Sequence, residues 1–144
     1  MQTFAATLTG ALLGWRFGAL TVIVWLAAGA LGLPVFSGPA TGIQKFMGPT
    51  AGYLLAFPFA AAVVGWLVGH GWNSRKVLLC FLAMIIGNLI CLTIGAGWLG
   101  MKIGLYKALT GGVLPFLPGA VIKSALATAV IALLARYGRT AEAR

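Results

Sequence analysis

Long apolar runs separated by short polar or Gly- and Pro-rich stretches are the main pattern of this sequence. The runs cover residues 3–13, 17–33, 53–69, 77–99 and 118–134. Because a helix needs about 20 residues to cross a bilayer, the last four runs with their flanks predict membrane-spanning helices. The first run has eleven residues and would reach only about 16 Å. It predicts a half-helix that is either packed against the protein or the remainder of a longer helix.

Composition supports a membrane protein. The 144 residues are 61% hydrophobic and 8% charged, with a mean hydropathy of +1.04, which is more apolar surface than a small soluble domain can bury. We therefore expect an all-α integral membrane protein, a helical bundle of about five membrane segments with a short first one. Residues 1–135 form the expected single transmembrane bundle and residues 136–144 a basic cytoplasmic tail.

Basic residues lie mostly at the ends of the apolar runs, which orients the bundle. The net charge is +9, but no basic face with interleaved aromatics is present, which argues against nucleic-acid binding. One predicted side carries Arg16, Arg75, Lys76, Arg136, Arg139 and Arg144, and the other carries Lys45, Lys102 and Lys107. Since cytoplasmic loops are enriched in Lys and Arg, the tail is predicted to be cytoplasmic.

The segments between the runs also carry information. Residues 34–52 are rich in Pro and Gly and cannot continue a helix. They also contain Phe36, Ile43, Phe46 and Met47, which are too apolar for a disordered connector. We expect an ordered external loop folded over the bundle. Residues 97–114 mix two lysines with aromatic and aliphatic side chains, which is typical of an interfacial helix or an aromatic-anchored loop.

Small residues recur within the runs at helix-packing spacing, for example Ala61, Gly65 and Gly69, and predict close helix contacts. Cys80 and Cys91 lie about 16 Å apart along one predicted helix, beyond disulfide reach, and are interpreted as small core residues.

Two polar residues inside the runs are candidate ligand-binding groups. Asn88 must bond either a neighbouring helix or a ligand. Lys123 lies near the outer end of the last helix, whereas the only acidic residue, Glu142, lies in the tail. The Lys123 ammonium could snorkel to lipid phosphate, lose its proton, or bind an anionic substrate.

The sequence does not contain the residues that several classes of function require. The chain has one histidine and no phosphate-binding loop signature, so neither a metal site nor ATP hydrolysis is expected. No intramembrane carboxylate is available as a proton relay, and no acid, base and nucleophile occur together. We expect no enzyme, no cofactor and no metal. A purely structural membrane subunit remains an alternative.

The stretches GLPVFSG, GPTAGYLLAFPFAAAVVGWL, GNLICLTIGAGWL and GGVLPFLPGAVIK follow one another along the chain. Together they resemble the BioY family, the biotin-specific substrate-binding (S) component of energy-coupling-factor (ECF) vitamin transporters. The resemblance implies a multi-pass protein of the bacterial cytoplasmic (inner) membrane, with six helices in the family. It further implies capture of biotin from the outer side, with a coupling subunit and ATPase subunits as partners, besides membrane lipids. The site residues so expected are Lys123, Asn88, Tyr53, Phe36 and Trp98.

This sequence departs from the family pattern at three points. The first family helix has no counterpart, which suggests a truncated chain. Ala120 stands where the family has an aspartate, and Cys91 replaces a tyrosine. With that acid absent, the resemblance makes the biotin carboxylate the best candidate partner of Lys123. The alternatives are an S component for another small anionic vitamin, or a structural subunit without transport activity.

Overall fold

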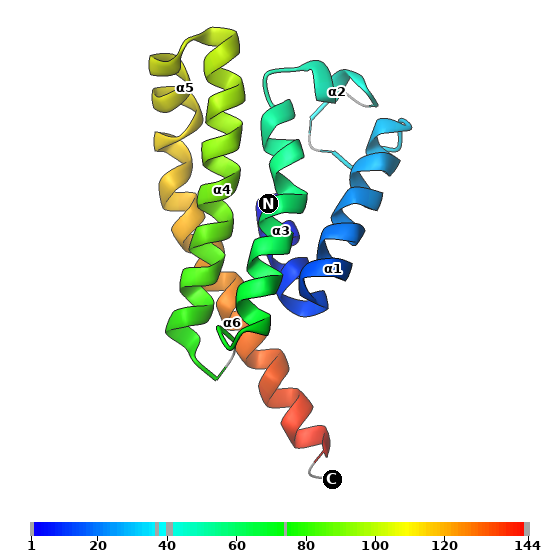
Figure 1. Cartoon of the computed structure of the whole chain (residues 1–144), viewed down its shortest axis with the longest axis vertical. Helices are drawn as coiled ribbons and strands as arrows, with labels where there is room; N and C mark the ends of the chain where they lie inside the picture. Colours follow the sequence, from blue (N-terminus) through cyan, green and yellow to red (C-terminus); the bar gives the residue numbers. More distant parts are fainter. Residues whose placement is uncertain (1, 37, 40–41, 74, 143–144) are drawn as a thin grey trace.

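A computed structural model describes residues 2–36, 38–39, 42–73 and 75–142, and these residues form helices and turns without any strand. The helices are α1 (Gln2–Ala30), α2 (Gln44–Met47), α3 (Ala51–Gly69), α4 (Val77–Ile103), α5 (Leu105–Gly112), a 3-10 turn (Leu114–Phe116) and α6 (Leu117–Glu142). Four stretches are long and apolar enough to cross a membrane: α1, α3, α4 and residues 105–138. The predicted all-α membrane bundle is confirmed (Figure 1).

Helix α1 is bent sharply, and the bend accounts for the two N-terminal apolar runs. Gly14 has φ +80° and ψ 174°, a conformation that glycine adopts without steric cost. The chain descends from the N-terminus to this bend and then rises again (Figure 1). The two arms touch where glycines meet, since a Cβ added to Gly18 would lie 2.6 Å from the Cα of Gly10.

Helix α3 packs on both arms of α1 through small residues. Gly10 lies directly against the backbone of Ala61, and Gly65 lies against the bend, where an added Cβ would be 2.5 Å from the Trp15 nitrogen. The prediction of close packing is therefore confirmed for Ala61 and Gly65, both buried. It is wrong for Gly69, which is exposed at the end of α3 with nothing around it.

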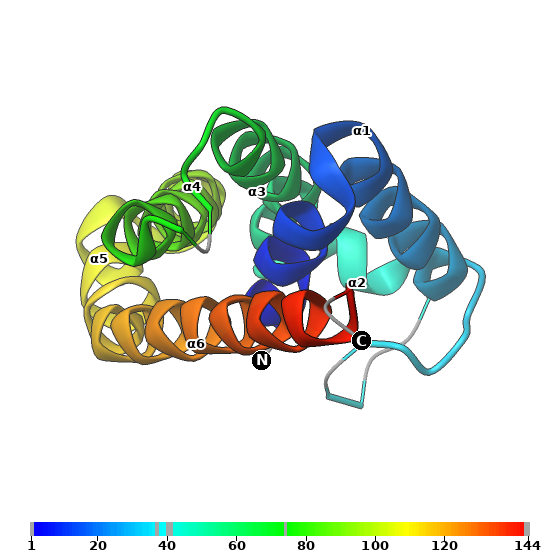
Figure 2. The ribbon, with the colours of Figure 1, turned by 90° about the horizontal axis from the view of Figure 1, so that it is seen from below.

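The N-terminal arm lies between α3 and α6 when the bundle is viewed from below (Figure 2). Val64, Cys80, Met84 and Ala127 form a buried cluster, and Phe4 of this arm packs against it. The arm is thus a half-helix supported by the rest of the bundle. Both cysteines are buried and free, as the sequence predicts.

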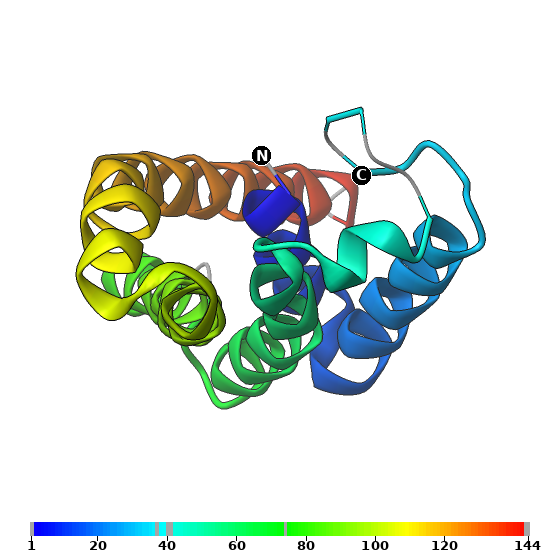
Figure 3. The same cartoon turned by 90° about the horizontal axis from the view of Figure 1, so that it is seen from above.

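The described part of the 34–52 loop covers one end of the bundle, where α2 lies across α1 and α3 (Figure 3). Phe36 is only 8% exposed and packs edge-on against Trp25 and Phe46, with ring centroids 5.1 and 5.8 Å apart. The indole nitrogen of Trp98 donates a hydrogen bond to the Gly48 carbonyl (3.1 Å). The expected ordered loop is confirmed for the residues that the structure describes.

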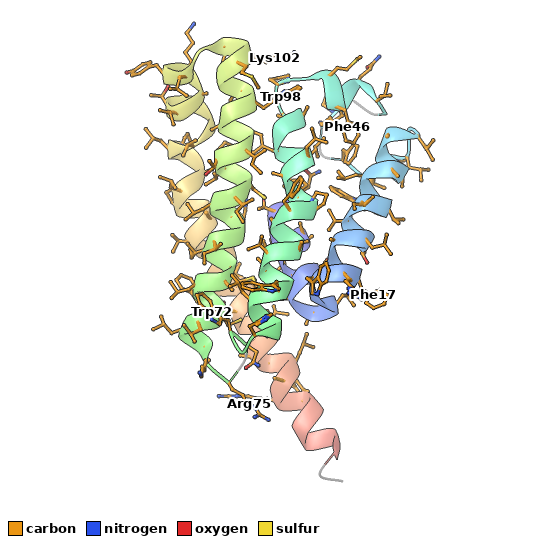
Figure 4. The ribbon with its side chains drawn as sticks, in the orientation of Figure 1. Phe17, Phe46, Trp72, Arg75, Trp98 and Lys102 are labelled. Atoms are coloured by element: carbon orange, nitrogen blue, oxygen red, sulfur yellow. The ribbon has the colours of Figure 1, made fainter. Side chains whose placement is uncertain are left out.

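The two ends of the bundle carry different side chains (Figure 4). Phe46, Trp98 and Lys102 lie at the end we call the Lys102 end, and Phe17, Trp72 and Arg75 lie at the opposite Arg75 end. Within residues 97–114, α4 continues to Ile103 and the short helix α5 (Leu105–Gly112) follows after Gly104. Helix α6 continues through Glu142, so the backbone of the expected tail is helical up to that residue.

Candidate functional site

A cavity of about 430 Å³ opens between α3, α4 and α6 near the Lys102 end. This volume falls within the range of about 300–1,000 Å³ that is typical of small-molecule sites. The cavity collects residues from all six α-helices, the 3-10 turn and the 34–52 loop. Its lining comprises Gln2, Thr3, Lys45, Thr50, Tyr53, Leu54, Phe57, Asn88, Cys91, Leu92, Leu99, Gly111, Gly112, Phe116, Ala120 and Lys123. Half of the non-glycine side chains in this lining are apolar, and polar groups are set among them.

Asn88 is the buried polar group of the α4 wall, with an exposed fraction of 3%. Its amide nitrogen donates to the Ser124 hydroxyl and to the Met84 carbonyl, each at 3.0 Å. Both N–H groups therefore have acceptors within the protein, which fixes the orientation of the amide. The carbonyl oxygen is the group that remains to accept a hydrogen bond from a ligand. The expected bond from Asn88 to a neighbouring helix is therefore present, and its bond to a ligand stays a prediction.

Lys123 enters the cavity from α6, one turn after Ala120. The side chain is half-buried and has no hydrogen bond or ion pair with any residue that the structure describes. The single acidic residue, Glu142, is 19 residues further along the same helix, which places it about 28 Å away along the axis. An ammonium beside an apolar cavity without a counter-charge is suited to bind an anion.

Tyr53 forms part of the α3 wall and connects it to the end of α5. Its hydroxyl donates to the Gly112 carbonyl at 2.8 Å, so only the hydroxyl oxygen remains for a ligand, as an acceptor. Its ring lies directly on Gly95, where any side chain would overlap it. Tyr53 is therefore held firmly by α4 and α5.

The other two expected site residues lie elsewhere. Phe36 is packed between Trp25 and Phe46, and Trp98 anchors the loop through Gly48. Neither is among the residues that line the cavity. Both instead position the loop above it, so their expected contact with a ligand stays a prediction.

Sequence reasoning missed four polar lining residues, namely Gln2, Thr3, Lys45 and Thr50. Lys45 had a detectable signal, because it is the only charged residue in the apolar loop. Gln2 and Thr3 begin the N-terminal arm, and their proximity to α6 follows only from the bend at Gly14. Across the described residues, no group of His, Cys, Asp and Glu side chains could hold a metal ion.

A comparison with known families identifies this architecture. The model of the BioY family matches residues 1–140. The chain belongs to the BioY family. A probable biotin transporter BioY of Pyrococcus horikoshii is 39% identical over 140 residues, covering 97% of this chain and 80% of the relative. The biotin transporter BioY of Rhizobium etli is 38% identical over 134 residues, covering 88% of this chain and 71% of the relative.

A solved structure matches the fold of this chain as well. The crystal structure of the S-component for biotin from an ECF-type ABC transporter superimposes with a TM-score of 0.81 and 28% identity. The match covers 94% of this chain and 74% of that structure. The helices of this BioY-family chain are therefore arranged as in that S-component for biotin.

Proposed function

We propose that this chain is the biotin-binding S component of an ECF-type transporter, which captures biotin at the Lys102 end and passes it across the cytoplasmic membrane. The observation that carries the proposal is the cavity itself. Within a fold matched to an S-component for biotin, one cavity is lined by both Asn88 of α4 and Lys123 of the neighbouring helix α6.

The chemistry of biotin suits these walls. Its ureido group offers two N–H donors, its fused rings are largely apolar, and its side chain ends in a carboxylate. The Asn88 carbonyl oxygen would accept a ureido N–H, because the amide nitrogen already donates to Ser124 and Met84. Lys123 would bind the carboxylate through a charge-assisted hydrogen bond. Apolar side chains such as Leu54 and Phe57 would surround the rings.

Transport requires partners in this account. The sequence has no phosphate-binding loop signature, so the energy for uptake comes from ATPase subunits acting through a membrane coupling subunit. The distribution of basic residues predicts that the Lys102 end faces outward and the Arg75 end faces the cytoplasm. Capture would then occur beneath the 34–52 loop.

Equilibrium dialysis of the purified protein against radiolabelled biotin tests the proposal. We expect saturable binding of one biotin per chain, competed by unlabelled biotin and not by uncharged vitamins. Absence of saturable binding by a folded protein would refute the function.

A second candidate, an S component for another small anionic vitamin, is favoured by one observation. Ala120 is buried in the cavity wall one helical turn before Lys123. Its side chain is small and uncharged, so the wall beside Lys123 does not select for one particular anion. Competition of labelled biotin with a panel of anionic vitamins separates the candidates. A competitor that displaces biotin at lower concentration than biotin itself would establish the second one.

A further inference from the structure

Lys45 is a second lysine at the cavity and comes from a different part of the chain than Lys123. It lies on α2, the four-residue helix Gln44–Met47 in the 34–52 loop, and lines the same cavity. Its ammonium also lies close to the other limb of the loop, because a Cβ added to Gly38 would be 3.2 Å from Nζ. Gly38 has φ +95°, a backbone conformation that favours glycine.

The charged side chains that line the cavity are consequently all positive. Two lysines contribute to its wall, one from the loop and one from α6. No Asp or Glu lines it, and the only acidic residue in the chain, Glu142, is near the far end of α6. Positive charge from both lysines therefore favours an anion at this part of the wall.

The two lysines are attached to different parts of the fold. Lys123 belongs to a long helix of the bundle, whereas Lys45 belongs to the loop that covers the same end. The loop is connected to the bundle at discrete points, among them the Trp98–Gly48 hydrogen bond and the packing of Phe36 on Trp25. A ligand that binds Lys45 therefore adds a direct link between the loop and the bundle.

We infer that Lys45 is a specificity-determining residue that binds the carboxylate of the ligand together with Lys123, so that the anion joins the loop to α6. This inference rests on the proposed function, because it assumes a carboxylate ligand in the cavity. It assigns Lys45 a contact in the bound state and makes slow release of the ligand depend on that contact.

The test compares Lys45→Met, Lys45→Gln and Lys45→Arg with the wild-type protein, using biotin and the uncharged biotin amide as probes. Lys107→Met is the matched control, since Lys107 is an exposed lysine on α5 that does not line the cavity. Association and dissociation rates are measured with radiolabelled ligand, and thermal unfolding checks that each variant is folded. The Gln variant serves in place of the Met variant if the latter unfolds.

We expect removal of the Lys45 charge to weaken biotin binding about tenfold, as the loss of a charge-assisted hydrogen bond from a half-buried lysine predicts. The loss should appear in the dissociation rate, because broken contacts change dissociation whereas lost electrostatic steering changes association. Lys45→Arg should retain most of the affinity. Biotin amide should bind the wild-type protein and the Lys45 variants alike.

Three results would overturn the inference while biotin still binds the wild-type protein. They are a change confined to the association rate, equal losses for biotin and its amide, or an equal loss in Lys107→Met. Failure of the wild-type protein to bind biotin at all would be a different result, because it removes the proposed function.

Discussion

Replacement of Lys123 by methionine separates the binding role of this lysine from any role in folding. Methionine keeps most of the length of the apolar stem and removes the ammonium. Lys123 has no carboxylate partner among the described residues, and Glu142 is far along α6. The substitution therefore leaves no buried acid uncompensated, and we expect the free energy of unfolding to stay equal or to rise.

The two expected effects differ in sign and size. Loss of a charge-assisted hydrogen bond to the ligand costs about 1.5–3 kcal/mol, which corresponds to a decrease in biotin affinity of about 10- to 150-fold. If Lys123 were instead half of a buried ion pair within the protein, its removal would lower stability by about 3–5 kcal/mol.

Equilibrium dialysis with biotin and thermal unfolding in detergent measure the two quantities on the same preparation. Biotin amide provides the internal control, because it lacks the charge and should be largely indifferent to the substitution. Wild-type affinity for biotin, or a protein destabilised by several kcal/mol, would refute the assignment of Lys123 to the anion.

Other parts of the structure make equally specific predictions. Ser124→Ala removes an acceptor of the Asn88 amide, so the free energy of unfolding should fall by about 0.6–1.7 kcal/mol and the affinity for biotin should fall with it. Thermal unfolding and equilibrium dialysis measure the two effects, and unchanged values for both would contradict this prediction. Gly10→Ala places a methyl group in the α3 backbone and should lower stability by about 1–3 kcal/mol, whereas an unchanged unfolding temperature would show that this contact is loose. In intact cells, Met47→Cys should react with an impermeant maleimide and His70→Cys should not, both residues being exposed; the opposite labelling would reverse the predicted orientation.

The helices could be predicted from the sequence because each apolar run is long enough to satisfy its own backbone in lipid. The relative placement of these helices could not be predicted from the sequence. The bend at Gly14 brings the N-terminal arm beside α6, but a single glycine between two apolar runs does not specify the direction of a turn. The partner of Asn88 is Ser124, 36 residues away, and the sequence shows only that such an amide needs some partner.

The candidate site was predicted in part, for a physical reason. Asn88 and Lys123 stand out because polar groups within membrane helices are costly, and both line the cavity. Phe36 and Trp98 have the same apolar and aromatic character whether they bind a ligand or hold a loop, and here they hold the loop. The position of Lys45 in the cavity lining was not predicted, because a lysine in a loop is usually exposed to solvent.

Filling the cavity with a large side chain tests whether biotin binds there. Ala120 is 7% exposed and lines the cavity, whereas Ala125 is exposed on another face of the same helix. Biotin binding by Ala120→Trp and Ala125→Trp should therefore be measured by equilibrium dialysis on proteins shown to be folded by circular dichroism. The account predicts that Ala120→Trp loses biotin binding and Ala125→Trp keeps wild-type affinity. Wild-type affinity in Ala120→Trp would place the biotin site elsewhere.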